Sequence, residues 1–349
     1  MSKDDSMRAL VVREAGGRFE AVRVPRPVPR EGEVLVRIHA SGVNPLDSKI
    51  RAGAAAHARH PLPAILGMDL AGVVEQVGPG VTAFRVGDEV YGLTGGVGGL
   101  QGSLAEFAAV DADLLAPKPA NLSMREAAAL PLVVITAWEG LVDRARTQAG
   151  QKVLVHGGAG GVGHVAVQIA VALGAQVYAT GLSAQAETIR GFDATPIDYT
   201  TTTVEQYVAA HTGGEGFDVV YDTVGGATLD ASFGAARQYG GHVVSCLGWG
   251  THKLAPLSFR AATYSGVFTL LPMLSGKGRA NHGHILREAA KLVEAGRLLP
   301  LMDARRFDFD AAMQAHEEVE AGRAKGKICL LYTSPSPRDK RQSRMPSSA

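Results

Sequence analysis

The sequence predicts an α/β protein in which an all-β, barrel-like domain is joined to a doubly wound domain with a parallel sheet. Three observations support this prediction. Residues 7–119 contain short runs of alternating polar and apolar residues between glycine turns. Residues 151–180 combine a buried strand, a glycine cluster and a helix. From residue 194 onward, strand-like and helix-like segments alternate, which is typical of a doubly wound parallel sheet.

Length, composition and charge limit the class of protein. The chain has 349 residues, enough for two domains with their own cores. Its formal net charge of +1 gives no indication of nucleic acid or a membrane surface as a partner. The chain start has no apolar signal core, and no apolar run approaches membrane-spanning length. Cys246 and Cys329 lie in apolar runs, so we expect buried thiols in a reducing, cytoplasmic compartment.

The all-β region consists of short strands followed by a helix start. Its strand-like runs are Met7–Val12, Phe19–Val24, Glu33–Ala40, Val73–Val77 and Glu89–Tyr91. The first two flank a Gly-Gly turn and predict a hairpin. Ser123 and Glu126 then have the spacing of a capping box, which predicts that a helix begins at Met124.

The segment 151–180 has the pattern of a dinucleotide-binding unit. A β-branched run at Val153–Val155 is followed by a G-x-G-x-x-G motif and then by apolar residues at helical spacing. Its first glycine permits a tight turn, the second lets a pyrophosphate approach the backbone, and the third lets the helix pack on the strand. The helix N-terminus favours phosphate. We therefore expect the phosphates at Gly158, Ala159, Gly160, Gly161, Val162 and Gly163.

The end of the following strand indicates which nicotinamide cofactor is bound. An acid at that position binds the ribose 2′-hydroxyl of NAD and repels a 2′-phosphate. Here Ala179–Ser183 contains no acid. Hydroxyl groups can donate to a phosphate, so Thr180, Ser183 and Tyr199 are expected at the 2′-phosphate, and the predicted cofactor is NADPH.

The rest of the chain continues the alternation. The expected elements are Ala194–Ile197, Val204–Ala210, Asp218–Asp222, Leu229–Arg237, His242–Leu247, a possible last sheet strand at Thr263–Leu271, a helix at His284–Ala295 and a final strand at Lys327–Leu331. Residues 332–349 are rich in Ser, Pro and Arg. We expect them to form a disordered basic tail.

Taken together, these motifs resemble the medium-chain dehydrogenase/reductase superfamily, and within it the zinc-free quinone oxidoreductase and zeta-crystallin branch. The supporting stretches are SGVNPLDSKIRAG (41–53), PAILGMDLAGVVEQVGPGV (63–81), VGDEVYG (86–92), AAALPLVVITAWEGL (127–141), HGGAGGVGHVAVQIA (156–170) and GFDVVYDTVGG (216–226). The resemblance implies a GroES-like catalytic domain at residues 1–122, a Rossmann domain at 123–264, a return to the catalytic domain at 265–331, and a homodimer.

The resemblance also implies that no metal is bound. Zinc alcohol dehydrogenases have a cysteine where this chain has Asn44, a Gly-His-Glu where it has Gly67-Met68-Asp69, and a third cysteine at the position of Leu132. The four-cysteine lobe of those enzymes corresponds to a glycine-rich stretch here. Tetrahedral zinc needs thiolate or imidazole ligands that converge on one point, and these positions supply none.

Without zinc, hydride transfer needs an electron-poor acceptor such as a quinone or an α,β-unsaturated carbonyl. We expect Asn44 to donate a hydrogen bond to the oxyanion, Asp47 to orient its neighbours, and Lys49 to stabilise charge or supply a proton. The resemblance further implies nicotinamide contacts from Thr136, Leu247, Gly248, Phe268, Leu270 and Lys327. Two alternatives stay open. One is a double-bond reductase for 2-alkenals or enoyl thioesters, and the other is a non-catalytic, NADPH-binding structural or regulatory protein.

Overall fold

The computed structural model describes residues 6–332 and divides into two compact units. Among the residues described, the first unit contains 6–132, 270–294 and 302–332, and the second contains 133–269 and 295–301. The tail expected at 332–349 lies outside the described residues except for Tyr332. Within 6–332, no helix has the combination of length and apolar composition needed to cross a membrane.

The first unit is mostly β-structure centred on one long strand, β3 (Glu33–Val43). Its other strands are β1 (Ser6–Val12), β2 (Glu20–Pro25), β4 (Ala64–Ile65), β5 (Asp69–Val77), β6 (Glu89–Leu93), β7 (Phe107–Asp111), β8 (Leu115–Pro117), β15 (Phe307–Asp308) and β16 (Ile328–Leu331). A three-stranded sheet has the order β2-β1-β4, and a seven-stranded sheet has the order β15-β16-β3-β5-β6-β8, with β7 also pairing with β3. Because β3 pairs with β5, β7 and β16, it joins early and late parts of the chain.

Short helices complete this unit. They are α1 (Pro45–Arg51), α2 (Met124–Ala128), α9 (Leu271–Ser275), α10 (Arg279–Glu294) and α11 (Ala312–Glu320). The capping box predicted at Ser123 and Glu126 is present at the start of α2. Helix α2 packs on β3 and β5, and the first unit continues to Leu132.

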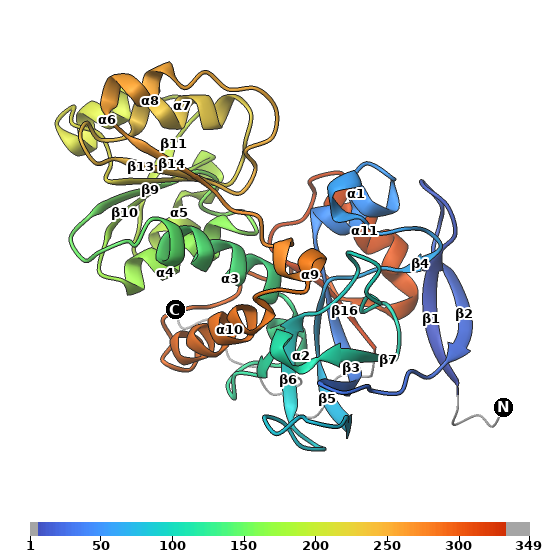
Figure 1. The fold of residues 1–349 in the computed structure, drawn as a ribbon. Helices are drawn as coiled ribbons and strands as arrows, with labels where there is room; N and C mark the ends of the chain where they lie inside the picture. The colour runs from blue at the N-terminus through green and yellow to red at the C-terminus, as the bar shows by residue number, and fades with distance from the viewer. Residues whose placement is uncertain (1–5, 333–349) are drawn as a thin grey trace, which may run out of the picture. The chain divides into compact units, whose positions relative to one another are not determined.

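The second unit is a parallel sheet with helices on both faces. The strands are β9 (Lys152–Val155), β10 (Gln176–Gly181), β11 (Thr195–Asp198), β12 (Val219–Asp222), β13 (His242–Ser245) and β14 (Thr263–Gly266). The helices are α3 (Pro131–Trp138, which begins in the first unit), α4 (Gly163–Ala172), α5 (Ala186–Arg190), α6 (Val204–Thr212), α7 (Ala227–Ala235) and α8 (Ala255–Arg260). Helices α4 and α5 cover one face of the sheet, and α6, α7 and α8 cover the other (Figure 1).

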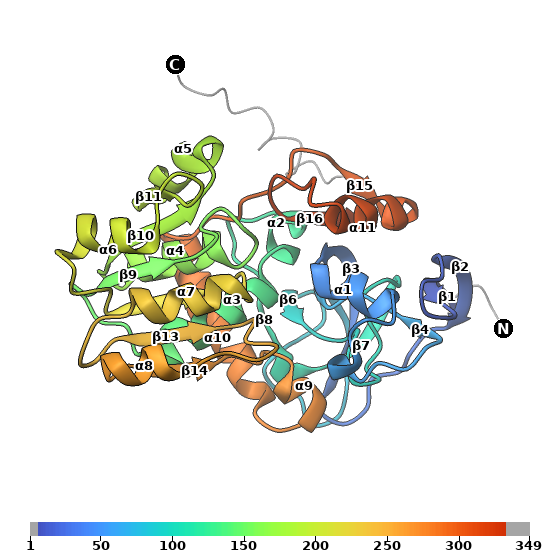
Figure 2. The same cartoon turned by 90° about the horizontal axis from the view of Figure 1, so that it is seen from above.

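All strands of this sheet are parallel, and their order β11-β10-β9-β12-β13-β14 changes sense after β9, the first of them in the chain. Figure 2 shows β9, β10 and β11 on one side of the sheet and β13 and β14 on the other. In open α/β sheets, ligands bind at such a switch point, beyond the carboxyl ends of the strands. Beneath this edge, Leu154, Val220 and Val243 of adjacent strands pack with Phe217 and Phe233 in a fully buried core. The glycine loop after β9 therefore lies at the position where a dinucleotide is expected.

The structure differs from the sequence predictions in several places, and helices α5, α8 and α9 and strands β4, β7, β8 and β15 were not predicted. No helix or strand was predicted for the segment with Asp47 and Lys49, which forms helix α1. The predicted strand Thr263–Leu271 is strand only to Gly266, because pairing with β13 ends there. Helix α11 was not predicted, although Asp308 caps the turn that leads into it.

Candidate functional site

The glycine loop between β9 and α4 is so close-packed that a larger residue has no room at two positions. A Cβ atom at Gly163 would lie 1.9 Å from the carbonyl oxygen of Gly157, and one at Gly158 would lie 2.4 Å from the Cβ of Ala179. Gly157 has φ +72°, a conformation that favours glycine. The tip of the loop, at Gly160 and Gly161, is exposed. The loop thus packs on its own backbone while its tip is open to a ligand.

The loop has the backbone features that are expected of a pyrophosphate site. Its backbone connects neighbouring strands, since Gly158 N donates to the Thr180 carbonyl at 2.8 Å and His156 N donates to the Tyr221 carbonyl at 2.9 Å. Helix α4 begins directly after the loop, at Gly163, so its positive N-terminal end points toward the same place. The predicted phosphate segment Gly158–Gly163, including Ala159 and Val162, forms this turn.

The hydroxyl groups expected at the 2′-phosphate have different surroundings. Thr180 is buried, and its Oγ1 accepts a hydrogen bond from Gly157 N at 3.1 Å, so this side chain supports the glycine loop. The Ser183 hydroxyl donates to the carboxylate of Asp198. Tyr199 is exposed on the same side of the sheet, with 56% of its surface accessible.

The residues expected at the nicotinamide are divided between the two units. In the second unit, Thr136 Oγ1 lies 2.8 Å from Thr269 Oγ1. Leu247 N donates to Ser245 Oγ at 3.0 Å, and a Cβ at Gly248 would lie 2.2 Å from the Tyr264 hydroxyl. The Phe268 ring meets Trp249 edge-on at 6.1 Å. Leu270 and Lys327 belong to the first unit.

A second set of functional groups lies inside the first unit. We call Asn44, Asp47, Asp69 and Lys327 the Asn44 cluster. All four side chains are buried, with exposed fractions of 5% or less. Asn44 and Asp47 are at the start of α1, Asp69 opens β5, and Lys327 precedes β16. The pairing of Ile328 with Val43 and of Asp69 with Gly42 brings these segments together.

The side chain of Asn44 is held from both ends. Its Nδ2 donates to Asp69 Oδ2 at 2.9 Å, and its Oδ1 accepts from the ammonium of Lys327. Asp69 Oδ1 accepts from Leu132 N at 2.9 Å, and Asp47 Oδ2 accepts from Asn44 N at 2.8 Å. A carboxylate on one side and an ammonium on the other permit only one orientation of the amide.

The cluster contains two carboxyl groups and one ammonium group, and burial makes ionising both acids costly. Desolvation raises the pKa of Asp47 to about 7, although the hydrogen bond from Asn44 N opposes the rise. Desolvation likewise raises the pKa of Asp69 to about 6, opposed by the charge of Lys327. One oxygen of Asp47 is buried and has no hydrogen-bond partner among the described residues, which also favours protonation. Near pH 7 Asp47 is therefore partly protonated, whereas an exposed aspartic acid would be fully ionised.

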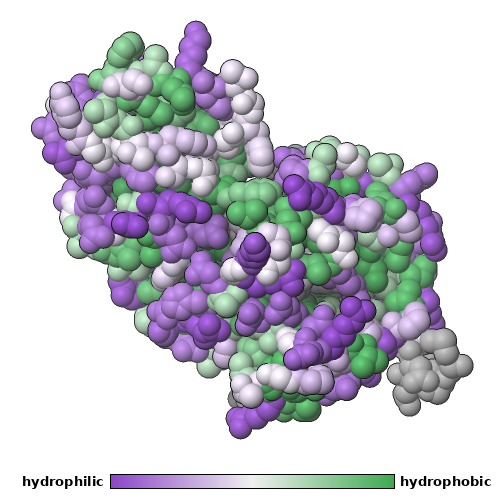
Figure 3. Space-filling model, viewed as in Figure 1, coloured by the Kyte–Doolittle hydropathy of each residue, from purple (hydrophilic) through white to green (hydrophobic). Residues whose placement is uncertain are grey.

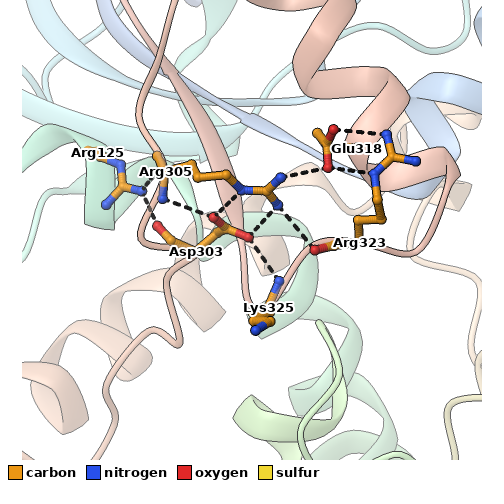
Figure 4. A network of polar contacts seen from close by, with 6 residues as sticks. All are labelled: Arg125, Asp303, Arg305, Glu318, Arg323 and Lys325. Carbon is orange, nitrogen blue, oxygen red and sulfur yellow. Dashed lines mark hydrogen bonds and ion pairs between the residues drawn. The ribbon is translucent and has the colours of Figure 1, made fainter.

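A polar network fixes the backbone that leads into Lys327 (Figure 4). Asp303 N donates to the Lys327 carbonyl at 3.0 Å, and Asp303 Oδ2 accepts from Lys325 N at 2.9 Å. Arg305 donates to both oxygens of Asp303 and also to Glu318 at 2.6 Å. Asp303 therefore holds the chain on both sides of Gly326, immediately before Lys327.

The structure brings together some of the residues predicted to be catalytic and separates another. Asn44 and Asp47 are in the cluster, whereas Lys49 is exposed on α1. Lys327, expected at the nicotinamide, bonds to Asn44. Asp69 was noted only because it stands where zinc enzymes have Gly-His-Glu; a buried acid at the start of an apolar strand is the signal that could have identified it. Whether these groups act in catalysis stays a prediction.

Among residues 6–332, no group of three or more His, Cys, Asp or Glu side chains is arranged to hold a metal ion. The expectation that the chain uses no zinc depends on the residue types at Asn44, Met68 and Leu132. It remains a prediction.

Two family models match the chain. Residues 30–120 match the alcohol dehydrogenase GroES-like domain, and residues 191–330 match the zinc-binding dehydrogenase domain. These ranges fall mainly in the first and second units, respectively, and the second model extends into β16 of the first unit.

Curated relatives are similar over most of their length. The chain is 36% identical to a 2-methylene-furan-3-one reductase of Solanum lycopersicum, covering 87% of this chain and 73% of the relative. It is 34% identical to a chloroplastic NADPH-dependent alkenal/one oxidoreductase of Arabidopsis thaliana, with coverages of 94% and 80%. It is 33% identical to a quinone oxidoreductase of Mus musculus, with coverages of 93% and 98%. Among solved structures, an alcohol dehydrogenase superfamily protein from Novosphingobium aromaticivorans is 60% identical, with a TM-score of 0.92 and coverages of 94% and 100%.

The glycine loop can be tested with Gly163→Ala. The added Cβ would collide with the Gly157 carbonyl, so we expect nicotinamide nucleotide affinity to fall at least ~10-fold while the rest of the unit stays folded. The measurement is titration with reduced nucleotide followed by its fluorescence. Gly234→Ala is the matched control, because a Cβ there meets no atom within 4 Å. Equal affinity in both variants would refute the assignment of the loop.

The raised pKa of Asp47 predicts that the free energy of unfolding depends on pH. The pKa of Asp47 is raised to about 7, so its contribution to folding is fully present below pH ~3.8 and is lost as the pH rises through ~7. Asp47→Asn is uncharged at every pH. Relative to this variant, the wild type should lose at least ~1 kcal/mol of unfolding free energy between pH 5 and pH 8, since one pKa unit is worth about 1.4 kcal/mol.

Urea unfolding at both pH values checks this prediction. Asp193→Asn, which changes an exposed carboxylate, is the control and should follow the wild-type pH dependence. Parallel pH profiles for the wild type and Asp47→Asn would contradict a buried, proton-holding Asp47.

Proposed function

The chain belongs to the medium-chain dehydrogenase/reductase superfamily, and from that membership we propose that it reduces quinones or α,β-unsaturated carbonyls with a nicotinamide cofactor. The family and its oxidoreductase relatives support the reaction class. The observation that carries the proposal for this chain is the fixed amide of Asn44 between Asp69 and Lys327. The cofactor, when bound, supplies the hydride.

The Asn44 cluster would stabilise the oxyanion that hydride addition creates. An amide has two N–H donors and an ammonium has three. Asn44 gives one to Asp69, and Lys327 gives one to Asn44 Oδ1 and a long one, 3.4 Å, to the Val43 carbonyl. The bonds found among the described residues therefore leave one hydrogen on each group. Both could bind the oxygen of an enolate or a hydroquinone anion, held in place before the reaction.

The same cluster would supply a proton near neutral pH. The raised pKa values of Asp47 and Asp69, about 7 and about 6, keep these carboxyl groups partly protonated in this pH range. A group with a pKa near the working pH suits general acid catalysis. The reduction consumes one proton after hydride transfer, so a buried carboxyl beside the oxyanion donors fits the chemistry.

The finer cofactor assignment is NADPH. It is supported by the absence of an acid in the segment Ala179–Ser183, by the exposed phenol of Tyr199, and by the NADPH dependence in the name of the Arabidopsis relative. We propose a shallow preference, since the hydroxyls of Thr180 and Ser183 already have partners. We also propose a cytoplasmic location, which subcellular fractionation would test.

A panel assay tests the reaction class. We expect oxidation of reduced nicotinamide with a benzoquinone, a naphthoquinone, an enone or a 2-alkenal, and not with a simple aldehyde. In Asn44→Ala, kcat should fall ~100-fold or more because an oxyanion donor is lost, while the cofactor dissociation constant changes less than ~2-fold.

Asn121→Ala provides the matched control for this variant. It removes a side-chain amide of the same unit that bonds to the Val293 carbonyl, outside the cluster, so kcat should remain near the wild-type value. Activity confined to the simple aldehyde, or full activity in Asn44→Ala, would overturn the proposal. Cofactor binding without turnover of any acceptor would favour a non-catalytic role.

We further propose that two copies associate through the β14 edge of the parallel sheet. The sheet order ends at β14, so one side of this strand has no neighbour in the sheet. Around it, Leu254, Phe259 and Tyr264 are exposed by 60%, 85% and 37%. Apolar surface gathers where Figure 1 draws α7 and α8 (Figure 3). A second copy would pair with the edge and cover these side chains.

Sedimentation equilibrium tests this association. Phe259→Asp puts a charge on the proposed contact and should shift the protein from about twice its monomer mass toward 36.4 kDa. Val28→Asp, at a residue 73% exposed in the first unit, is the control and should stay dimeric. A monomeric wild type, or a dimer that tolerates Phe259→Asp, would contradict the interface.

A further inference from the structure

Asp198 lies at the edge of the parallel sheet where the adenosine ribose of a dinucleotide is expected. It is the last residue of β11, and it pairs with Gly181, the last residue of β10. The preceding residue of β10, Thr180, holds the glycine loop through its carbonyl and its hydroxyl. In this fold, the residue that reads the ribose 2′ position stands at the end of that strand. Asp198 therefore brings a carboxylate to that place from the neighbouring strand.

Three hydrogen bonds keep this carboxylate in place and ionised. Ser183 Oγ donates to Oδ2, Thr200 N donates to Oδ1 at 2.9 Å, and Thr200 Oγ1 donates to Oδ1 at 2.6 Å. The hydrogen bond from Ser183, followed by those from Thr200, lowers the pKa of Asp198. A hydroxyl has one hydrogen to donate. Ser183 uses it on Asp198, so it has none left for a phosphate.

The surrounding charge is negative as well. Residues 182–203 contain one basic side chain, Arg190, against three acids, Glu187, Asp193 and Asp198. Arg190 forms an ion pair with Glu187. A 2′-phosphate placed here would meet a fixed carboxylate without a dedicated cation. A ribose 2′-hydroxyl can instead donate a hydrogen bond to that carboxylate.

We propose that Asp198 keeps the NADPH preference of this chain shallow, because its carboxylate accepts a hydrogen bond from the ribose 2′-hydroxyl of NADH and repels the 2′-phosphate of NADPH. This inference rests on the dinucleotide site of the proposed function. In that site, Asp198 would limit the preference for NADPH over NADH. NADH is then a working cofactor, and loss of the Asp198 charge makes the site selective for NADPH.

The test uses two small probes that differ only in the 2′-phosphate, 2′,5′-ADP and 5′-AMP. Their dissociation constants are measured by calorimetry on the full chain, with no acceptor and no turnover. In Asp198→Asn, the affinity for 2′,5′-ADP relative to 5′-AMP should rise about 10-fold, a size expected for removing one like charge at short range. The ratio of kcat/KM for NADPH and NADH should shift the same way.

Two further variants separate position from charge. Asp193→Asn removes the same charge from an exposed site in this segment, where φ is +60° and asparagine is well tolerated. It should change the probe ratio less than ~2-fold. Ser183→Ala removes the hydroxyl but leaves the carboxylate, so it should not raise the relative affinity for 2′,5′-ADP. Thermal unfolding confirms that each variant is folded.

The outcomes distinguish this inference from the proposed function. An unchanged probe ratio in folded Asp198→Asn, or an equal rise in Asp193→Asn or Ser183→Ala, overturns the role of Asp198 and leaves the reductase proposal standing. Failure of the wild type to bind either probe overturns the nucleotide site and the role of Asp198 together.

Discussion

The first unit depends on burying two carboxyl groups and one ammonium group around a single amide. Each charged group loses its hydration, and that loss is compensated only if its neighbours supply hydrogen bonds and opposite charge. Asn44 meets this need by bonding to Asp69 on one side and to Lys327 on the other. Because Asn44 and Lys327 are 283 residues apart, the cluster forms only when the beginning and the end of the chain fold together.

Contacts in the surrounding structure hold the segments that carry the Asn44 cluster in place. Gly42 faces Asp69 across the β3–β5 pair, and a Cβ there would lie 2.3 Å from the Ala128 carbonyl, so glycine permits the close approach of α2. Asp303 bonds to the backbone on both sides of Gly326 and thereby fixes where β16 delivers Lys327. Glu318 and Arg305 extend that support to α11. These contacts determine the position of the Lys327 ammonium, which bonds to Asn44 and to the Val43 carbonyl.

The two candidate sites differ in how far the sequence could predict them. The glycine loop depends on backbone geometry within 30 residues, and local spacing is enough to identify such a motif. The family pattern was enough to name Asn44 and Asp47. Their contacts with Asp69 and Lys327 could not be predicted, because they depend on strand pairing between segments that are far apart in the chain. For the same reason, Asp198 was not predicted from the sequence as a residue of the cofactor site. Asp198 lies at the expected ribose site because β11 pairs with β10 and places Asp198 beside Gly181. The prediction of the cofactor was based on the residues at the end of β10.

The chemistry of the Asn44 cluster fits the substrates that the family suggests. A metal ion polarises a carbonyl before hydride arrives, which a simple aldehyde needs. An amide hydrogen and an ammonium hydrogen are weaker electrophiles than a metal ion, and here the Asn44 amide and the Lys327 ammonium are already hydrogen-bonded to each other. They suit an acceptor whose product anion is already spread over a ring or an enolate, where hydrogen bonds need only complete the stabilisation. In the proposed mechanism, the carboxyl and ammonium groups that are buried together in the cluster are also the groups that would favour electron-poor acceptors.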